Sequence, residues 1–214
     1  MAGRPSRADE VRRDVLDGAA DIFSQRGYRA TSMAEIAAAV GLSKPTMYHY
    51  FRNKEEILVR LYEEVMADAL DNARSVVTSV EEPIEVLRML IAARVQNTCE
   101  RSSIHKVFFE EEGEVPADLL QTVIEQRRSY ETILKDLVQQ HLDALRYPPD
   151  INITVFVNSC LGAANWVYKW YQPDGPLSPQ QLGQEIARYV LRPLTAQHAS
   201  APVAPVREQG GPQT

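Results

Sequence analysis

The 214-residue sequence has only two cysteines, and aromatic residues make up only 7% of it. Cys99 and Cys160 are far apart and form no C-x-x-C pair, so the sequence predicts neither a disulfide framework nor a zinc site. It also lacks an apolar run of the roughly 18 residues that a membrane span needs, and it opens with no signal-peptide pattern. We therefore expect a cytoplasmic protein that has no membrane partner.

Motifs for catalysis and cofactor binding are missing as well. The four histidines are widely separated, and the sequence has no H-E-x-x-H, Walker, G-x-G-x-x-G or G-x-S-x-G motif. The glutamates of residues 110–114 could suggest a cation site, but a solvated helix end is the simpler interpretation. The sequence thus predicts a protein that is not an enzyme and that holds no cofactor and no metal.

The residues that are present indicate a globular protein with two unlike ends. Apolar residues make up 44% of the chain, which is typical of a folded protein. The net charge is −6, but residues 1–54 hold nine Lys or Arg against six Asp or Glu, a balance of +3, whereas the remainder carries −9. A basic end on an acidic body suits a protein that contacts phosphate groups with one end only.

Residues 32–54, SMAEIAAAVGLSKPTMYHYFRNK, predict two short helices joined by a glycine turn. Ser32 and Glu35 have the spacing of a capping box, and Gly41 suits the left-handed residue that ends a helix. Apolar residues recur at helical spacing on one face of each helix, first Met33, Ile36, Ala37 and Val40, and then Met47, Tyr50 and Phe51. Helix, tight turn and helix is the helix-turn-helix arrangement that binds DNA.

Burial of the apolar face of the second helix would leave hydrogen-bond donors exposed at its N-terminal end, where the helix dipole favours phosphate. A solvated helical hairpin would rarely expose Tyr48 and His49 beside a lysine. We expect phosphate contacts from Lys44, Tyr48, His49 and Lys54, and contacts to base edges or thymine methyl groups from Ser43, Pro45 and Thr46. The predicted DNA-binding set also includes Ser32, and Arg4 and Arg7 from residues 1–8, which form either a basic arm or a frayed terminus.

The rest of the chain has helical periodicity, which predicts an all-α fold. Helices are expected at about 9–25, 54–79, 83–100, 117–144, 149–171 and 179–195. No Pro/Gly linker precedes the helix of 54–79, so a continuous helix would join residues 1–54, which we call the head, to a second domain at 55–197. Residues 198–214 are rich in Pro, Gly, Gln and Ala and are expected to be a disordered tail.

Two stretches within residues 11–58 resemble the DNA-binding domain of a known family. AADIFSQRGYRATSMAEIA and VGLSKPTMYHYFRNKEEIL are similar to TetR-type (Tet repressor/AcrR) transcriptional regulators. The resemblance implies a homodimer whose three-helix heads bind palindromic operator DNA, with a ligand-binding and dimerisation domain at 55–197 that dimerises through the helices of 149–171 and 179–195. It implies a ligand-released repressor, and the alternative is a transcriptional activator.

The C-terminal half carries a second resemblance. VFFEE, the region of residues 128–130 and LGAANWVYKWYQPDGPLSPQQL look like the regulatory domains of TetR-type repressors of fatty-acid and steroid degradation. Acyl-CoA thioesters release members of that group from DNA, so the resemblance implies an acyl-CoA effector. The competing class is an apolar drug, as in multidrug-type repressors.

Candidate ligand-binding residues are large or polar side chains within otherwise apolar helices. Asn158 and Asn165 are seven residues apart, hence on one helix face, and a buried amide needs hydrogen-bond partners. Arg127 and Arg128 could meet an anionic group of a ligand, or simply the glutamates of 110–114. For the aromatic residues, core packing is the alternative. The predicted set is Phe108, Phe109, Arg127, Arg128, Tyr130, Asn158, Asn165, Trp166 and Trp170.

Overall fold

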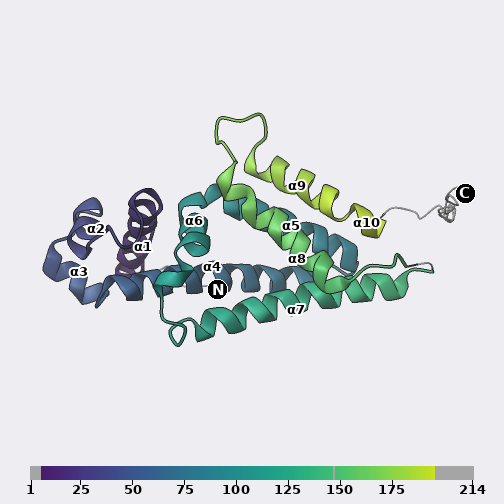
Figure 1. Ribbon diagram of the computed structural model, residues 1–214, viewed down its shortest axis with the longest axis horizontal. Coiled ribbons are helices and arrows are strands. Elements are labelled where there is room, and N and C mark those ends of the chain that lie inside the picture. Colours follow the sequence, from purple (N-terminus) through teal and green to yellow (C-terminus); the bar gives the residue numbers. More distant parts are fainter. Residues whose placement is uncertain (1–5, 147, 196–214) are drawn as a thin grey trace, which may run out of the picture.

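A computed structural model describes residues 6–146 and 148–195, and within these residues the expected all-α fold is confirmed (Figure 1). The helices are α1 (Arg7–Arg26), α2 (Met33–Ala39), α3 (Lys44–Tyr50), α4 (Lys54–Ser79), α5 (Pro83–Glu100), α6 (Ser102–Glu110), α7 (Gln121–Ala144), α8 (Ile153–Asn165), α9 (Pro179–Val190) and α10 (Arg192–Thr195), with 3₁₀ helices η1 (Glu112–Glu114) and η2 (Trp166–Lys169). None of these helices combines the length and apolar character needed to cross a membrane. Arg4 and the predicted tail of 198–214 lie outside the described residues.

The head consists of α1, α2 and α3, and its local geometry follows the sequence signals. Glu35 N donates to Ser32 Oγ at 3.3 Å and Ser32 N donates to Glu35 Oε2 at 2.8 Å, which completes the capping box of α2. Gly41 has φ +68°, the left-handed conformation expected of the residue in the turn. A Cβ added to Gly18 of α1 would lie 2.5 Å from Val40 Cγ1, so this glycine lets α1 and α2 pack closely.

Helix α4 extends from the head along the body, with α7 packed beside it (Figure 1). Asn53 caps its start, since Asn53 Oδ1 accepts a hydrogen bond from Glu56 N at 2.8 Å. Buried residues occur along the whole helix, from Ile57 near the head to Val76 near the far end. The apolar cores of the head and the body therefore form one continuous cluster.

Helix α5 is central to the body and contacts α4, α7, α8 and α9. It lies closest to α9, where a Cβ on Gly183 would be 2.4 Å from the carbonyl oxygen of Ala92. Cys99 and Cys160 are both buried free thiols, and burial raises the pKa of each to about 11. Within the described residues, both serve as apolar packing residues of the body.

Several predicted helix boundaries were wrong. The expected helix of 149–171 is divided into α8 and η2, and α8 begins late because Asn152 caps it, with Val155 N donating to Asn152 Oδ1 at 3.1 Å. The expected helix of 117–144 begins only at Gln121, because the preceding residues form hydrogen-bonded turns. Arg7, predicted in an N-terminal arm, lies in the first turn of α1, whose capping box is formed by Ser6 and Asp9.

Candidate DNA-binding face and effector cavity

Helix α3 presents the residues predicted to meet DNA. Its buried anchor is Met47, and Ser43 caps its start by accepting a hydrogen bond from Thr46 N at 3.3 Å. Tyr48 is 47% exposed. The other predicted residues of this region, Ser43, Lys44, Pro45, Thr46 and His49, are exposed as well. The structure thus places a polar, cation-bearing surface along the exposed face of α3, from its N-cap to its last turn, and its contacts to DNA stay a prediction.

The ammonium group of Lys54, which was expected to contact phosphate, is bound within the protein. Its Nζ donates to the carbonyl oxygens of Tyr28 at 2.6 Å and Thr31 at 2.8 Å, and lies 3.4 Å from that of Arg29. It also lies 4.2 Å from the ring centroid of Tyr28. An ammonium group has three donors, so this lysine holds the α1–α2 turn against the start of α4 instead of presenting a free cation.

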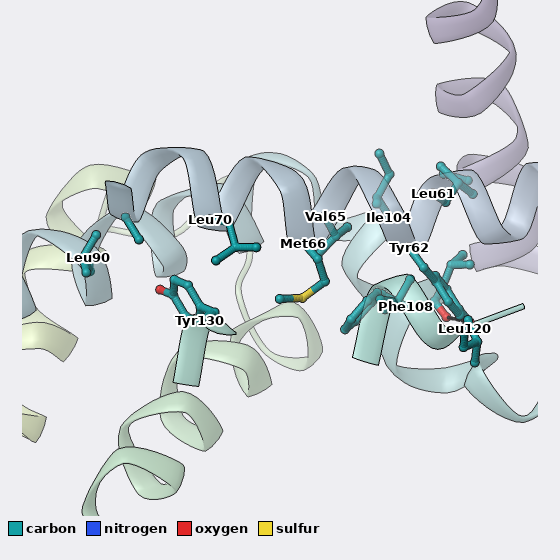
Figure 2. Close-up of a cluster of buried hydrophobic side chains, with 14 of the residues drawn as sticks. Leu61, Tyr62, Val65, Met66, Leu70, Leu90, Ile104, Phe108, Leu120 and Tyr130 are labelled. Carbon is teal, nitrogen blue, oxygen red and sulfur yellow. Dashed lines mark hydrogen bonds between the residues drawn. The ribbon is translucent and has the colours of Figure 1, made fainter. Parts of the chain in front are cut away.

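A cavity of about 260 Å³ lies in the body between α4, α5, α6, α7 and α8. Figure 2 shows Met66 reaching from α4 into the space between Phe108 and Tyr130, all of which line this cavity. Six of the nine predicted ligand-binding residues line it, namely Phe108, Phe109, Arg127, Tyr130, Asn158 and Asn165. Asn158 and Asn165 therefore do share the cavity-facing side of α8, as their spacing predicted.

The other three predicted residues do not line this cavity. Arg128 is exposed, because it follows Arg127 on α7 and therefore points about 100° away around the helix. Trp166 is 59% exposed and Trp170 is 51% exposed, and both border a surface depression together with Tyr189. Because α8 ends at Asn165 and continues as a 3₁₀ helix, its cavity-facing side does not extend to the tryptophans.

Aromatic rings connect the cavity to the helices on either side. The ring centroids of Tyr62 and Phe108 are 5.1 Å apart, those of Phe108 and Phe109 are 5.0 Å apart, and Phe109 stacks on Tyr168 at 5.6 Å. The Tyr62 hydroxyl donates to the carbonyl oxygen of Val107 at 3.1 Å. The series joins α4, α6 and η2, so a ligand that displaces Phe108 would disturb all three.

Glu111 and Glu114, which follow α6, form hydrogen bonds to the head. The expectation that the glutamates of 110–114 form a solvated helix end was therefore wrong. Glu111 Oε1 accepts a hydrogen bond from Tyr28 N at 3.2 Å, and both carboxylate oxygens of Glu114 accept from Arg29 Nε, at 2.9 and 2.7 Å. Lys106 Nζ donates to the carbonyl oxygen of Ser24 at 2.6 Å. We call these three interactions the head contact.

The remaining glutamates of this run are paired within the body. Glu112 accepts a hydrogen bond from Arg127 at 3.1 Å, which agrees with the predicted alternative that this arginine meets the glutamates of 110–114. Glu110 forms an ion pair with Lys169. Glu112 also lines the cavity. The segment of residues 108–114 thus borders the cavity and also forms hydrogen bonds to the head. Sequence reasoning missed this role because the residues of the head contact are 82–85 positions apart in the chain.

An apolar surface covers α8 and α9, the helices that the sequence predicted for dimerisation. Val155 is 62% exposed and Tyr189 is 75% exposed, and Trp166 at the start of η2 and Trp170 just after η2 extend the surface. Phe156 and Val190 line a groove between the two helices. Clustered exposed apolar side chains are a feature of interaction sites, and the use of this surface for dimerisation stays a prediction.

Comparison with protein families identifies the class of protein. The profile of the bacterial regulatory proteins of the tetR family matches residues 15–61, and that of the Tetracyclin repressor-like C-terminal domain matches residues 80–194. The chain therefore belongs to the TetR family. It is a ligand-responsive, DNA-binding transcriptional regulator and not an enzyme.

Individual proteins are similar to it over most of their length. The HTH-type transcriptional repressor KstR2 of Mycolicibacterium smegmatis is 29% identical over 198 residues, which are 89% of this chain and 94% of the relative. The ketosteroid transcriptional regulator KstR2 of Mycobacterium tuberculosis superimposes with a TM-score of 0.77 at 26% identity, covering 88% of this chain and 95% of that one. AibR in complex with isovaleryl coenzyme A and operator DNA superimposes with a TM-score of 0.73 at 27% identity, covering 84% and 97%.

Proposed function

We propose that this protein is a cytoplasmic homodimeric repressor that binds a palindromic operator and is released by an acyl-CoA thioester. Its relative KstR2 is a transcriptional repressor, which favours repression over activation. AibR was crystallised with both an acyl-CoA and operator DNA, which favours the thioester class.

The exposed end of α3 is the DNA-reading surface in this proposal. Lys44, Tyr48 and His49 contact phosphates, and Pro45 and Thr46 lie where a recognition helix meets base edges. One such helix reaches only a few base pairs, so two are required, about 34–36 Å apart on one side of the duplex. The apolar surface of α8 and α9 supplies the dimer interface that sets this spacing.

The observation that carries the proposal is that one segment serves both the cavity and the head. Phe108 and Phe109 of α6 and Glu112 of η1 line the cavity, whereas Glu111 and Glu114 of the same segment bind the head. A ligand that pushes against Phe108 and Phe109 moves the head contact with them. We infer that this movement, together with α4, changes the separation of the two heads and weakens operator binding.

The size and lining of the cavity favour an acyl group over a purely apolar drug. A cavity of about 260 Å³ is larger than the roughly 150 Å³ that accommodates benzene, and is below the usual range for a drug-sized ligand. It would hold a short acyl group, and the nucleotide part of the thioester would lie outside. A purely apolar drug would offer no hydrogen bond to Asn158, or to the N–H donors of Arg94 that Asn165 does not use, in a desolvated site.

The test is operator release measured by fluorescence anisotropy, on a duplex that the purified protein selects from a random pool. Isovaleryl-CoA and longer acyl-CoA thioesters are expected to weaken binding about 5–150-fold, in the usual range of allosteric coupling. Release by apolar drugs, with no effect of any thioester, would contradict the effector class. The double variant Lys44→Ala, Tyr48→Ala should lose operator binding and remain a dimer, and unchanged affinity would contradict the DNA-binding surface.

A further inference from the structure

Arg94 is a buried cation whose hydrogen-bonding capacity is largely unused. It lies on α5 and is only 8% exposed. Its Nε donates to Asn165 Oδ1 at 3.0 Å, and within the described residues the guanidinium makes no other hydrogen bond and no ion pair. A guanidinium has five N–H donors, so most of those of Arg94 have no hydrogen-bond acceptor among the described residues. Burial lowers the pKa of Arg94, which expresses the cost of holding this charge away from water.

The other charged groups that line the cavity neutralise one another or pair with a neighbour. Arg127 and Glu112 form an ion pair at 3.1 Å, and Glu131 pairs with Lys135 at 3.7 Å. These pairs leave the positive charge of Arg94 without a counter-ion in the described lining of the cavity. Holding a charge away from water without a counter-ion costs free energy, so Arg94 is a candidate site for an anionic group that the cavity admits.

Carboxylates on the far side of Arg94 do not serve as its counter-ion. A second cavity of about 280 Å³ borders Arg94 there, and Asp68 and Glu100 line it. Asp68 is bound to Arg101 at 2.8 Å, and Glu100 is exposed and accepts a hydrogen bond from Gln96 at 2.8 Å. The bond to Asn165 instead directs the Nε of Arg94 toward α8 and the first cavity.

We propose that this first cavity takes a carboxylate group of the effector, which Arg94 binds through its unused N–H donors. Asn158 and Asn165 line the same cavity and supply further polar contacts. Charge-assisted, bidentate hydrogen bonds are stronger than hydrogen bonds between neutral groups, and the planar guanidinium has the geometry to form them with a carboxylate. The inference rests on the proposed function, in that a small molecule fills the cavity. It narrows the effector to a carboxylate-bearing compound, such as an acyl group with a second carboxyl at its far end.

Isothermal titration calorimetry with the full chain tests this specificity. Glutaryl-CoA and valeryl-CoA both carry a five-carbon acyl group, and they differ in the terminal carboxylate. We expect glutaryl-CoA to bind at least about tenfold more tightly, since a hydrogen bond to a charged group contributes that much. Coenzyme A alone serves as the probe for a phosphate group as the source of the anion, and free glutarate serves as the probe for a carboxylate without a thioester.

Two variants locate the preference at Arg94. Arg94→Met removes the cation and should abolish the preference for glutaryl-CoA. Asn165→Asp keeps the shape of the side chain and places a carboxylate beside Arg94 Nε, so it should also abolish the preference and should raise the melting temperature by supplying the missing counter-ion. If Arg94→Met does not fold, Asn165→Asp alone tests whether the preference for glutaryl-CoA depends on the Arg94 cation. Arg128→Met, at an exposed arginine of α7, is the matched control and should keep the preference.

Each outcome of the titrations bears on the proposal. Equal affinity for the two thioesters in the unaltered protein, or a preference that survives in either variant, would overturn it. So would Arg94-dependent binding of coenzyme A alone, which would assign the anion to a phosphate, or failure of all four probes to bind. Arg94-dependent binding of glutarate without binding of any thioester would support the carboxylate site and would refute the acyl-CoA effector.

Discussion

Arg29 and Glu114 are 85 positions apart, yet the Nε of Arg29 donates to both carboxylate oxygens of Glu114, at 2.9 and 2.7 Å. Arg29 belongs to the turn between α1 and α2, and Glu114 ends η1. The adjacent backbone N–H of Tyr28 donates to Glu111, also from the segment after α6. Two consecutive residues of the head are therefore held by the segment that borders the cavity.

Glu114→Ala should uncouple the effector from DNA. Arg29 is 84% exposed at its side chain, so the melting temperature should hardly change. The ratio of operator affinities without and with effector should fall by about 2–30-fold, the usual range for a residue that carries coupling. Anisotropy titrations measure this ratio. Glu85→Ala removes an exposed ion pair on α5 and is the control, and an equal ratio in both variants would refute the role of the head contact.

Lys44→Ala and Lys54→Met should affect DNA binding differently. Lys44 is exposed at the start of α3, so its loss should weaken binding to every duplex and lower the slope of log K against log salt by about one for each recognition helix. Lys54 donates to backbone carbonyls of the head, so its loss should lower stability with little change in that slope. Titrations between about 50 and 200 mM salt give the slopes. A larger drop in slope for Lys54→Met would contradict the assignment.

The head could be predicted from sequence because its determinants are local. Ser32, Ser43 and Asn53 each begin a helix where the spacing of the capping residues indicates. Gly18 shows the limit of such reasoning, because a glycine within a helix is unfavourable by itself and becomes understandable only when Val40 is seen against it.

The cavity could be predicted only in part, for the same physical reason. Asn158 and Asn165 share a helix face by periodicity alone, and both line it. Arg94 was missed because α5 has an unremarkable apolar pattern, and the lack of a counter-ion emerges only when α7 and α8 are packed around it. Trp166 was misplaced because the change from α-helix to 3₁₀ helix at that residue leaves no clear signal in the sequence.

Gly18→Ala should destabilise the protein although alanine favours helices. The added Cβ would meet Val40 Cγ1 at 2.5 Å, and overpacking of this kind costs about 1–3 kcal/mol, which over most of that range exceeds the gain of about 1 kcal/mol in helix propensity. Gly162→Ala is the matched control, because a Cβ there meets nothing within 4 Å and should stabilise α8. Urea unfolding gives both values. Equal effects of the two substitutions would show that α1 and α2 can separate without cost.

Tyr189→Asp combined with Val155→Asp should convert the protein to a monomer with weak operator binding. These side chains are 75% and 62% exposed, so the fold of a single chain should tolerate the charges, whereas a dimer interface would bury them unpaired. Sedimentation velocity and anisotropy measure the two effects. Val77→Asp, at a 42% exposed residue of α4, should remain dimeric. A double variant that stays dimeric would place the interface elsewhere.

His105 should make the protein less stable in mild acid. The side chain is fully buried, its Nε2 lies 2.7 Å from Asn97 Oδ1, and its Nδ1 has no partner among the described residues. Burial, with Arg94 and Arg101 nearby, holds the pKa of His105 well below 6.5. Below about pH 6.5 the unfolded chain therefore binds a proton at His105 and the folded chain does not, so the free energy of unfolding falls as the pH falls.

The His105→Gln variant isolates this contribution to the free energy of unfolding. Its glutamine amide can still donate to Asn97 but does not titrate, so the difference between the variant and the unaltered protein should change by up to about 1.4 kcal/mol per pH unit between pH 5 and 6.5, and should be constant above pH 7.5. Urea unfolding across this range provides the measurement. A stability curve for His105→Gln that runs parallel to that of the unaltered protein would mean that the buried imidazole accepts its proton without opening the fold.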